Sequence, residues 1–599
     1  MPRKVAGAYD EADMYDYDDD YDDDYDDGMD AYDEVPRPMV PVKAAKPKGA
    51  KGKGKGAGAV GSAVQASAKA AKDAAPPAKP AAPKAQPAVR NAAAAHIPPE
   101  PSPPHSVADE VPSASPPPSS TAPKGPRYPT RPFGEYVLPR ALEQACAAAQ
   151  AEDGDDPGGG GKPLIHLVVL GHVDAGKSTL MGRLLHDIGA VSQQQVHKNR
   201  RAAEQMGKGS FGWAWLLDER PEERARGVTI DVAMARFETQ HRRVVLLDAP
   251  GHRDFVPNMI TGASQADAGL LVVDGSPGGF EAGFTEPQVG GAGGGQTREH
   301  AQLARSLGVG QLAVVVTKLD TCGWDAGRFE EIKGQLGAFL MGQCGFKASA
   351  LQWLAASGVT GENVAAPPTD AQMLTWHSGP TVVGAIDAFQ PPPRAVSAPF
   401  RMTVLDGSTR VRGLGTTAGG KVECGAVMKG SQVLLMPAGL LCNVKGIEHH
   451  GKAREVARAG DSCDVGLGDT DALAVGRGTV LCDPAFPVHV ATKLVVEVVV
   501  MDPKMPIIPG RSFVLHVHAA ATRAVVSRIL ATMDPRTGKV TKSNPRALAK
   551  GHAGLVEISV PDGVCVDVHS DCRALGRVAL RDGGVTSAAG LVCSVSSGL

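Results

Sequence analysis

The sequence predicts an α/β domain followed by two β-barrel domains, with a disordered extension in front of them. Three observations support this division of the 599 residues. Strand-like apolar runs alternate with helical segments over residues 162–395, whereas short strands separated by Gly and Asp turns fill residues 396–599. Residues 1–125 contain too few apolar side chains to offset the entropy lost when a chain is ordered.

The N-terminal extension is divided by charge. Residues 9–34 are almost wholly Asp and Tyr, the following stretch "KAAKPKGAKGKGKG" is basic, and an Ala/Pro/Ser tract continues to about residue 125. The whole chain has a formal net charge of only −3, which argues against a general binder of polyanions. We expect disorder over residues 1–125 and a linker over residues 126–161, in which "LPRALEQACAAAQ" forms one short helix.

Cysteine usage and hydropathy favour a cytoplasmic protein. The ten cysteines include no C-x-x-C pair, so neither a zinc site nor a disulfide framework is indicated, and we expect buried thiols in a reducing compartment. No apolar stretch approaches membrane-spanning length, and the N-terminus lacks the apolar core of a signal peptide. We therefore expect no association with a membrane.

The α/β domain is expected to contain a mostly parallel sheet. Apolar runs of buried-strand type occur at residues 163–170, 244–248, 269–274, 312–318 and 353–357. Helical segments separate them, and in the first of these, "KSTLMGRLLHDIGA", four apolar residues share one face: Leu180, Leu184, Leu185 and Ile188. The Gly content of "TEPQVGGAGGG", residues 285–295, predicts a surface insertion.

Residues 396–487 and 488–599 are each expected to form one β-barrel, and the stretch "DPAFP" divides them. The alternation in "SFVLHVH" is typical of a half-buried strand and places Phe513, Leu515 and Val517 on one face. The pair His449–His450 is expected in a barrel loop, where the absence of further ligands nearby in the sequence gives metal binding little support.

A phosphate-binding loop is predicted between the first strand and the first helix of the α/β domain. "GHVDAGKS" fits the pattern G-x-x-x-x-G-K-[ST] in the structural context that the motif requires. Backbone N–H groups and the helix N-terminus would surround the phosphates, Lys177 would supply a positive charge, and Ser178 would supply a hydroxyl to Mg²⁺. The predicted phosphate-binding residues are Gly171, His172, Val173, Asp174, Ala175, Gly176, Lys177, Ser178, Thr179 and Gly251.

Three further motifs follow strands in the order that a guanine nucleotide site requires. Asp248 ends an apolar run and is the expected carboxylate near Mg²⁺. In "TKLD", Asp320 would accept from the two N–H groups of guanine, a donor pair that adenine does not offer. "ASG" would present a backbone N–H to the guanine oxygen, so the predicted guanine-binding residues are Thr317, Lys318, Asp320, Ser357 and Gly358. Ligands bind at the carboxyl ends of such strands, which strengthens the combination.

The motifs resemble those of translational GTPases of the elongation-factor class. "GHVDAGKSTL", "RARGVTID", "DAPGHRDFVPNMITGASQAD" and "GQTREHAQLARSLGV" are all similar to this family's fingerprints, and "GKVECG" and "LGRVALRDGGVTSAAGLV" resemble its second and third domains. The resemblance covers residues 162–599 and implies a GTPase domain, two β-barrels, GTP or GDP with Mg²⁺, and ribosome-stimulated hydrolysis.

The resemblance also assigns roles to single residues. Thr229 is implied as the residue that joins Ser178 and Asp248 around Mg²⁺ when GTP is bound. Val173 and Val228 resemble a hydrophobic gate beside the γ-phosphate. His252 is implied as the catalytic residue that orients the attacking water; outside such a family it would be interpreted as a solvated turn histidine. No arginine finger is evident, and in this family a ribosomal RNA phosphate assists the histidine.

Among the members of the family, the sequence most resembles the HBS type. The similarity lies in "FGWAWLLDERPEERARGVTIDVAMARFET", in "NVKGIEHHG" and in the acidic start of the chain. It implies a ribosome-rescue factor that delivers a Pelota-type, release-factor-like protein to stalled ribosomes in no-go and non-stop mRNA decay, as a monomer or a heterodimer with that partner. A class II release factor and an elongation factor that delivers aminoacyl-tRNA remain alternatives, as does a scaffold that binds GTP without hydrolysing it.

Two features leave further alternatives open. The family usually has Asn at the position of Thr317, so we expect modestly weaker nucleotide affinity, tested by Thr317→Asn. The acidic head could dock on a ribosomal protein or only solubilise the chain, and the Lys/Gly run could contact ribosomal RNA or serve as a linker.

Overall fold

The computed structural model describes most of the chain from residue 131 onward. Not described are residues 1–130, 154–161, 209–211, 219, 227, 286–294, 406–408, 412, 450, 502, 535–536 and 597–599. The predicted disordered extension and nearly all of the predicted insertion therefore lie outside the described residues. No helix in the described part of the chain is both long and apolar enough to cross a membrane.

A six-stranded sheet forms the centre of the α/β domain. Its strand order is β2-β3-β1-β4-β5-β6, and all neighbours are parallel except the antiparallel pair β2 and β3. The strands are β1 (Leu164–Leu170), β2 (Ala233–Glu238), β3 (Arg243–Asp248), β4 (Ala268–Asp274), β5 (Gln311–Thr317) and β6 (Leu351–Ala355). The predicted fold class, an α/β domain followed by β-barrels, is confirmed.

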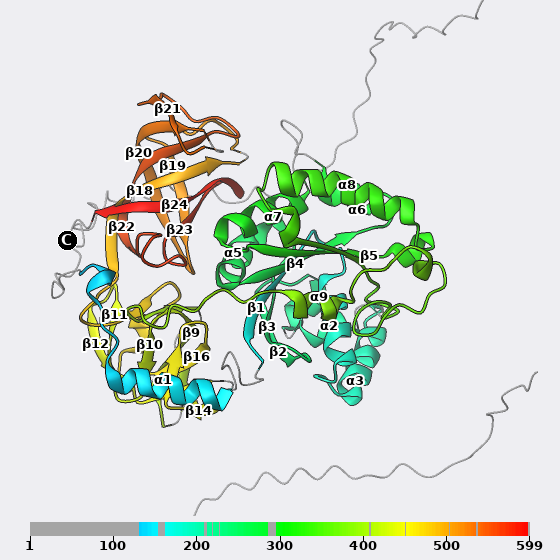
Figure 1. Ribbon diagram of the computed structural model, residues 1–599, viewed down its shortest axis with the longest axis horizontal. Coiled ribbons are helices and arrows are strands. Elements are labelled where there is room, and N and C mark those ends of the chain that lie inside the picture. Colours follow the sequence, from blue (N-terminus) through cyan, green and yellow to red (C-terminus); the bar gives the residue numbers. More distant parts are fainter. Residues whose placement is uncertain are drawn as a thin grey trace, which may run out of the picture. The chain divides into compact units, whose positions relative to one another are not determined.

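Helices cover both faces of this sheet (Figure 1). The longer ones are α2 (Lys177–Asp187), α3 (Gln193–Gln205), α5 (Val256–Gln265), α7 (Gln296–Leu307) and α8 (Ala326–Gly342). Three are short: α4 (Pro221–Arg226), α6 (Gly279–Phe284) and α9 (Val382–Ala388). Short 3₁₀ turns occur at Ala214–Leu216, Arg253–Phe255, Leu319–Cys322, Ala348–Ala350 and Met373–Thr375.

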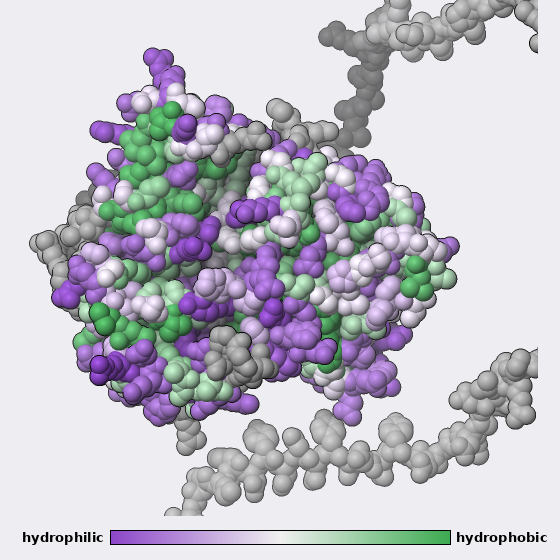
Figure 2. All heavy atoms as spheres, in the orientation of Figure 1, coloured by the Kyte–Doolittle hydropathy of each residue, from purple (hydrophilic) through white to green (hydrophobic). Residues whose placement is uncertain are grey.

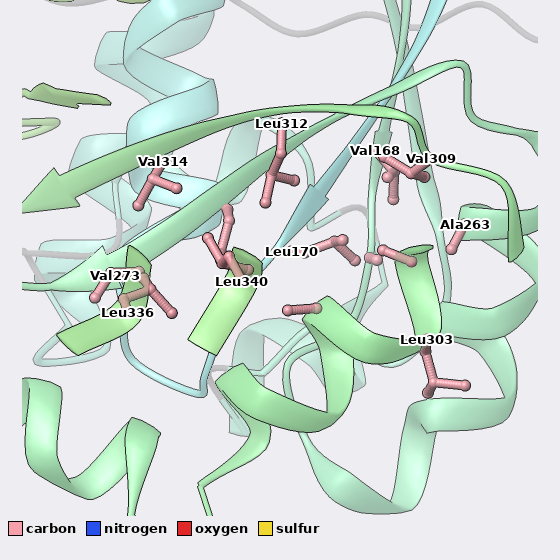
Figure 3. Close-up of a cluster of buried hydrophobic side chains, with 14 of the residues drawn as sticks. Val168, Leu170, Ala263, Val273, Leu303, Val309, Leu312, Val314, Leu336 and Leu340 are labelled. Atoms are coloured by element: carbon pink, nitrogen blue, oxygen red, sulfur yellow. The ribbon is translucent and has the colours of Figure 1, made fainter. Parts of the chain in front are cut away.

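The alternation of side chains along β1 creates two separate cores. Val168 and Leu170 pack with α5, α7 and α8, whereas Leu167 and Val169 pack with α2 and α9. Figure 3 shows the first core, in which Leu170 lies among side chains of α5, α7 and α8. Strands β1, β3, β4 and β5 are buried on both faces and are continuous apolar runs, and this is why the sequence revealed them. The edge strand β2 is largely unburied and was not predicted.

The next sheet is nine-stranded and antiparallel. Its strands are β7 (Arg401–Val404), β8 (Thr409–Val411), β9 (Gly415–Cys424), β11 (Gln432–Met436), β12 (Leu440–Asn443), β13 (Gly446–His449), β14 (Lys452–Arg454), β16 (Ser462–Gly466) and β17 (Val480–Cys482). A separate pair consists of β10 (Ala426–Met428) and β15 (Val456–Arg458). The predicted loop position of His449 is wrong, because its backbone pairs with Lys452 in an antiparallel hairpin.

The last sheet is seven-stranded and closed. It contains β18 (His489–Val500), β19 (Ser512–Val517), β20 (Ala520–Met533), β21 (Val540–Ser543), β22 (Ala553–Val566), β23 (Arg577–Asp582) and β24 (Val585–Ser596). Strand β19 pairs with both β20 and β23, which closes the ring of strands. The predicted apolar face of β19 points into the barrel core, where Phe513, Leu515 and Val517 are buried.

Residues before the α/β domain form a helix, α1 (Arg140–Asp153), preceded by a 3₁₀ turn at Phe133–Glu135. Leu142 and Cys146 of α1 pack against Ala426 and Val456 of the pair β10–β15. All ten cysteines are free thiols; seven are buried, two are half-buried and Cys593 is exposed.

Candidate nucleotide-binding site

A cavity of about 410 Å³ opens at the carboxyl-terminal edge of the six-stranded sheet. Fifteen of the predicted site residues line it: Val173, Asp174, Gly176, Lys177, Ser178, Thr179, Val228, Thr229, Gly251, His252, Thr317, Lys318, Asp320, Ser357 and Gly358. They come from segments that are almost 190 residues apart in the sequence, and the parallel strands bring them together at one edge. The sequence did not single out Ala214, Asp218, Thr321 and Val359, which also line the cavity.

The loop between β1 and α2 has a backbone that needs glycine at two positions. Gly176 has a positive φ of 87° immediately before α2 begins at Lys177. At Gly171 a Cβ atom would lie only 2.2 Å from the carbonyl oxygen of Val272, so β1 and β4 approach too closely there for any side chain. The first residues of α2, Lys177 to Thr179, line the cavity, so the N-terminus of this helix lies where an anion would bind.

Lys177 is a buried cation at the end of this loop. Its side chain is 7 % exposed, and its Nζ donates to the carbonyl oxygens of Gly171 (3.2 Å) and His172 (2.8 Å). Burial lowers the pKa of Lys177, because it disfavours the charged ammonium group, and the nearby charges of Asp248, Asp174 and Asp218 offset this only in part. Negatively charged phosphates in the cavity would compensate this charge.

Hydroxyl and carboxylate oxygens converge beside Lys177. Ser178 Oγ donates to Asp248 Oδ2 at 2.7 Å and lies 3.2 Å from Thr229 Oγ1. Asp248 is fully buried, and burial raises its pKa to about 6. Its second oxygen, Oδ1, is buried and accepts no hydrogen bond within the part of the chain that the structure describes. Hard oxygen donors with an unsatisfied buried carboxylate oxygen fit the requirements of Mg²⁺.

Asp218 is a further carboxylate beside Ser178, Thr229 and Asp248, and the sequence did not indicate it. Thr229 Oγ1 donates to Asp218 Oδ1 at 3.2 Å. Burial, followed by the nearby charges of Asp248 and Glu223, raises the pKa of Asp218 to about 7. Its sequence signal was weak, because an Asp after the apolar pair Leu216–Leu217 carries no motif of its own.

The turn after β3 brings a glycine and a histidine to the cavity. At Gly251 a Cβ would lie 2.3 Å from Lys177 Nζ, so only glycine leaves room for the lysine. The side chain of His252 is 44 % exposed at the rim, and its Nδ1 accepts from the backbone N–H of Asp254 at 3.3 Å. The Nε2 atom therefore carries the proton in the neutral ring and is available as a donor.

The opposite end of the cavity holds the predicted base-binding residues. Lys318 has a positive φ of 60°, and its Nζ donates to Asp174 O (2.6 Å) and Asp274 Oδ2 (2.8 Å). Thr317 Oγ1 donates to Ala175 O at 2.7 Å, which ties β5 to the phosphate-binding loop. At Gly358 a Cβ would lie 2.9 Å from the Cα of Leu180, so the loop after β6 approaches α2 at a point where only glycine fits.

Four predicted residues lie behind the wall of the cavity rather than on it. Gly171 and His172 accept from Lys177, Ala175 accepts from Thr317, and Asp248 accepts from Ser178. These hydrogen bonds hold Lys177, Thr317 and Ser178 in their places on the cavity wall.

Comparisons with known proteins agree with this geometry. The family described as "Elongation factor Tu GTP binding domain" matches residues 162–406, and the family described as "GTP-eEF1A C-terminal domain-like" matches residues 493–593. Protein HBS1 of Drosophila melanogaster is 43 % identical over 434 residues, which are 72 % of this chain but only 63 % of that protein. This chain therefore spans less than two thirds of the length of that relative.

Other relatives are matched over nearly their whole length. Elongation factor 1-alpha of Staphylothermus marinus is 40 % identical over 437 residues, which cover 73 % of this chain and 97 % of that protein. The solved structure of the S. cerevisiae Ski7 GTPase-like domain bound to GTP has a TM-score of 0.60 at 16 % identity and covers 72 % of this chain and 97 % of its own. The likeness to Ski7 concerns the fold alone.

Proposed function

Because the chain belongs to the elongation-factor-1-alpha family of translational GTPases, we propose that it binds Mg²⁺ and GTP in the cavity at Lys177 and hydrolyses GTP on ribosomes. The observation that supports this most strongly is convergence in one cavity. Lys177 and Ser178, Thr229, and His252 come from three separate segments and line the same space.

The chain's own residues would bind the phosphates and hold them in position. Lys177 places its ammonium group opposite the phosphates, and the N–H groups of the loop before α2 donate to their oxygens. Ser178 and Thr229 provide hydroxyl oxygens for Mg²⁺, with Asp248 behind them as the carboxylate. Bound Mg²⁺ would neutralise the charge that develops on the phosphates.

The catalytic role is assigned to His252. At the rim, Nδ1 accepts from the N–H of Asp254, so the neutral ring carries its proton on Nε2. We expect Nε2 to donate to the attacking water when the ring leaves this contact and turns towards the phosphates. Val173 and Val228, the proposed hydrophobic gate, line the cavity and limit the access of other water molecules. Phosphoryl transfer depends on positioning and charge stabilisation, so one oriented imidazole has a large effect on the rate.

Replacement of His252 by Ala tests this role. We expect the ribosome-stimulated rate of phosphate release to fall about 100-fold or more, while the affinity for GTP changes little. His241→Ala, an exposed turn histidine outside the cavity, is the matched control. If the His252 variant releases phosphate at the rate of the unaltered protein, the chain is a scaffold that binds GTP without this catalytic step.

The proposed biological role is the delivery of a Pelota-type, release-factor-like protein to stalled ribosomes in the cytoplasm. Ribosomal RNA and small-subunit proteins would be further partners. The relative HBS1 supports this choice. The last barrel also exposes apolar side chains suited to a protein partner, and the part of Figure 2 that contains β18–β21 is comparatively rich in hydrophobic residues. These exposed residues are Val499, Met505, Ile508, Val514 and Val540.

A pull-down distinguishes this role from that of a release factor. Retention of a Pelota-type protein by the GTP-bound chain supports ribosome rescue, whereas retention of a class I release factor supports the alternative. Retention of aminoacyl-tRNA would instead identify an elongation factor.

A further inference from the structure

The short helix α4 lies between the two segments that place Asp218 and Thr229 in the cavity. It begins at Pro221, which suits the first position of a helix, and its third residue is Glu223. The side chain of Glu223 is not in the cavity lining and is only 5 % exposed. A buried carboxylate needs several hydrogen-bond donors, and these donors show what Glu223 does.

The Glu223 carboxylate accepts three backbone hydrogen bonds. Its Oε2 accepts from the N–H of Arg220 at 3.3 Å, which is the backward hydrogen bond of a capping box. Its Oε1 accepts from the N–H groups of Ile230 (2.9 Å) and Asp231 (3.3 Å), the two residues that follow Thr229. One side chain therefore joins the start of α4 to the backbone of the Thr229 segment.

The neighbouring residue of α4 holds the other segment. Arg224 Nε donates to Asp218 O at 2.7 Å, and Arg224 Nη2 donates to Trp215 O at 3.2 Å. The guanidinium group also lies over the Trp215 ring, 5.4 Å from its centroid. Helix α4 thus fixes both segments, and the hydrogen bond from Thr229 to Asp218 connects them inside the cavity.

We propose that Glu223 is a positioning residue that holds Thr229 in place for the Mg²⁺ and γ-phosphate of bound GTP. Thr229 reaches the cavity only while the backbone of residues 230–231 stays where Glu223 binds it. Loss of the carboxylate releases two backbone N–H groups and with them the adjacent threonine. This inference rests on the proposed GTP site and extends it to a residue that does not contact the nucleotide.

Nucleotide affinities separate this role from a general loss of stability. With the full chain and Mg²⁺, we expect Glu223→Ala to weaken binding of the non-hydrolysable analogue GMPPNP about tenfold and of GDP less than about twofold. Glu223→Gln, whose amide oxygen still accepts from Ile230 and Asp231, should remain within about threefold of the unaltered chain. The exposed neighbour Glu222→Ala is the matched control and should change neither affinity.

A double-mutant cycle with Thr229→Ala tests whether Glu223 acts through the threonine. On that background, Glu223→Ala should cost less than about twofold in GMPPNP affinity, because the group that it positions is already absent. Equal losses for GDP and GMPPNP, or losses that add fully in the double variant, would overturn the proposal. If Glu223→Ala does not fold, Glu223→Asp, which withdraws the carboxylate by one methylene, takes its place. If the proposed GTP site itself were wrong, the result would be different, because the unaltered chain would then bind neither GDP nor GMPPNP.

Discussion

The two ends of the cavity are built differently. At the phosphate end, Lys177, Thr229 and Asp248 are at most 8 % exposed, and their polar atoms are held by several segments of the chain. At the base end, the buried side chains of Thr317 and Ser357 are neutral, and the charged residues are more open to solvent: Asp320 is half-buried and the Lys318 side chain is 38 % exposed.

The difference shows where the protein keeps charge away from water. Buried charges interact strongly with a ligand, but they are costly to the empty protein, as the lowered pKa of Lys177 and the raised pKa of Asp248 indicate. The charges of the base end are less desolvated, so we expect that end to select through the direction of hydrogen bonds and to add less affinity. We therefore expect substitutions at the phosphate end to have larger effects than substitutions at the base end.

The largest effect is expected for Lys177→Met, which keeps the length of the side chain and removes its charge. Loss of a buried charge-assisted contact should weaken GTP binding about 100- to 1,000-fold. Thermal denaturation of the nucleotide-free variant should show no loss of stability. The substitution removes an ammonium group whose burial is unfavourable in the empty protein. Fluorescence titration with a labelled nucleotide measures the affinity, and Lys198→Met on an exposed face of α3 is the control. Near-normal GTP affinity in the Lys177→Met variant would contradict the inference that substitutions at the phosphate end have the larger effects.

An intermediate effect is expected when the pH is lowered. Burial raises the pKa of Asp248 to about 6, so the carboxyl becomes protonated below that pH, and Mg²⁺ requires the ionised form. The apparent Mg²⁺ affinity of the GDP complex should be nearly constant above pH 7 and fall about tenfold per pH unit below about 6. Mg²⁺ titrations of GDP release at several pH values measure this, and Asp248→Asn should make the slope shallower, leaving the part due to Asp218 and the GDP phosphates. The same slope in that variant would assign the titration to another group.

The smallest effect is expected for Thr317→Asn at the base end. The Thr317 hydroxyl is already engaged, since it donates to Ala175 O and, at 3.1 Å, to Val273 O. A longer amide would add a contact to the base, and we expect the GDP dissociation constant to decrease about two- to fivefold. Calorimetric titration measures the constant, with Thr375→Asn, an exposed threonine outside the cavity, as the control. An unchanged constant would refute the expectation of weakened affinity from the sequence.

Residues carried by contiguous motifs were recognised from the sequence, and residues that act across segments were not. Lys177 and Ser178 stand in one short pattern between a strand and a helix, so their placement follows from local geometry. Asp218 comes to the cavity from a separate segment and accepts from Thr229 there, and Glu223 reaches the Thr229 segment through Ile230 and Asp231. A partner across a turn leaves no periodicity in the sequence, and this explains why both residues were missed.

The β-barrels also contain a residue whose position could not be predicted from the sequence. Alternation identified the core face of β19, but short strands with little alternation gave no basis for placing His449, whose strand β13 was taken for a loop. Strand pairing between distant residues decided that position.

The sequence by itself determined the order of the domains, the parallel sheet and the phosphate-binding loop, because apolar periodicity and glycine requirements act over a few neighbouring residues. Only the tertiary structure decided how the segments around Asp218, Thr229 and Asp248 meet, and which carboxylates are buried there. Desolvation and hydrogen bonding depend on atoms that are close in space, and the folded chain brings those atoms together from positions far apart in the sequence.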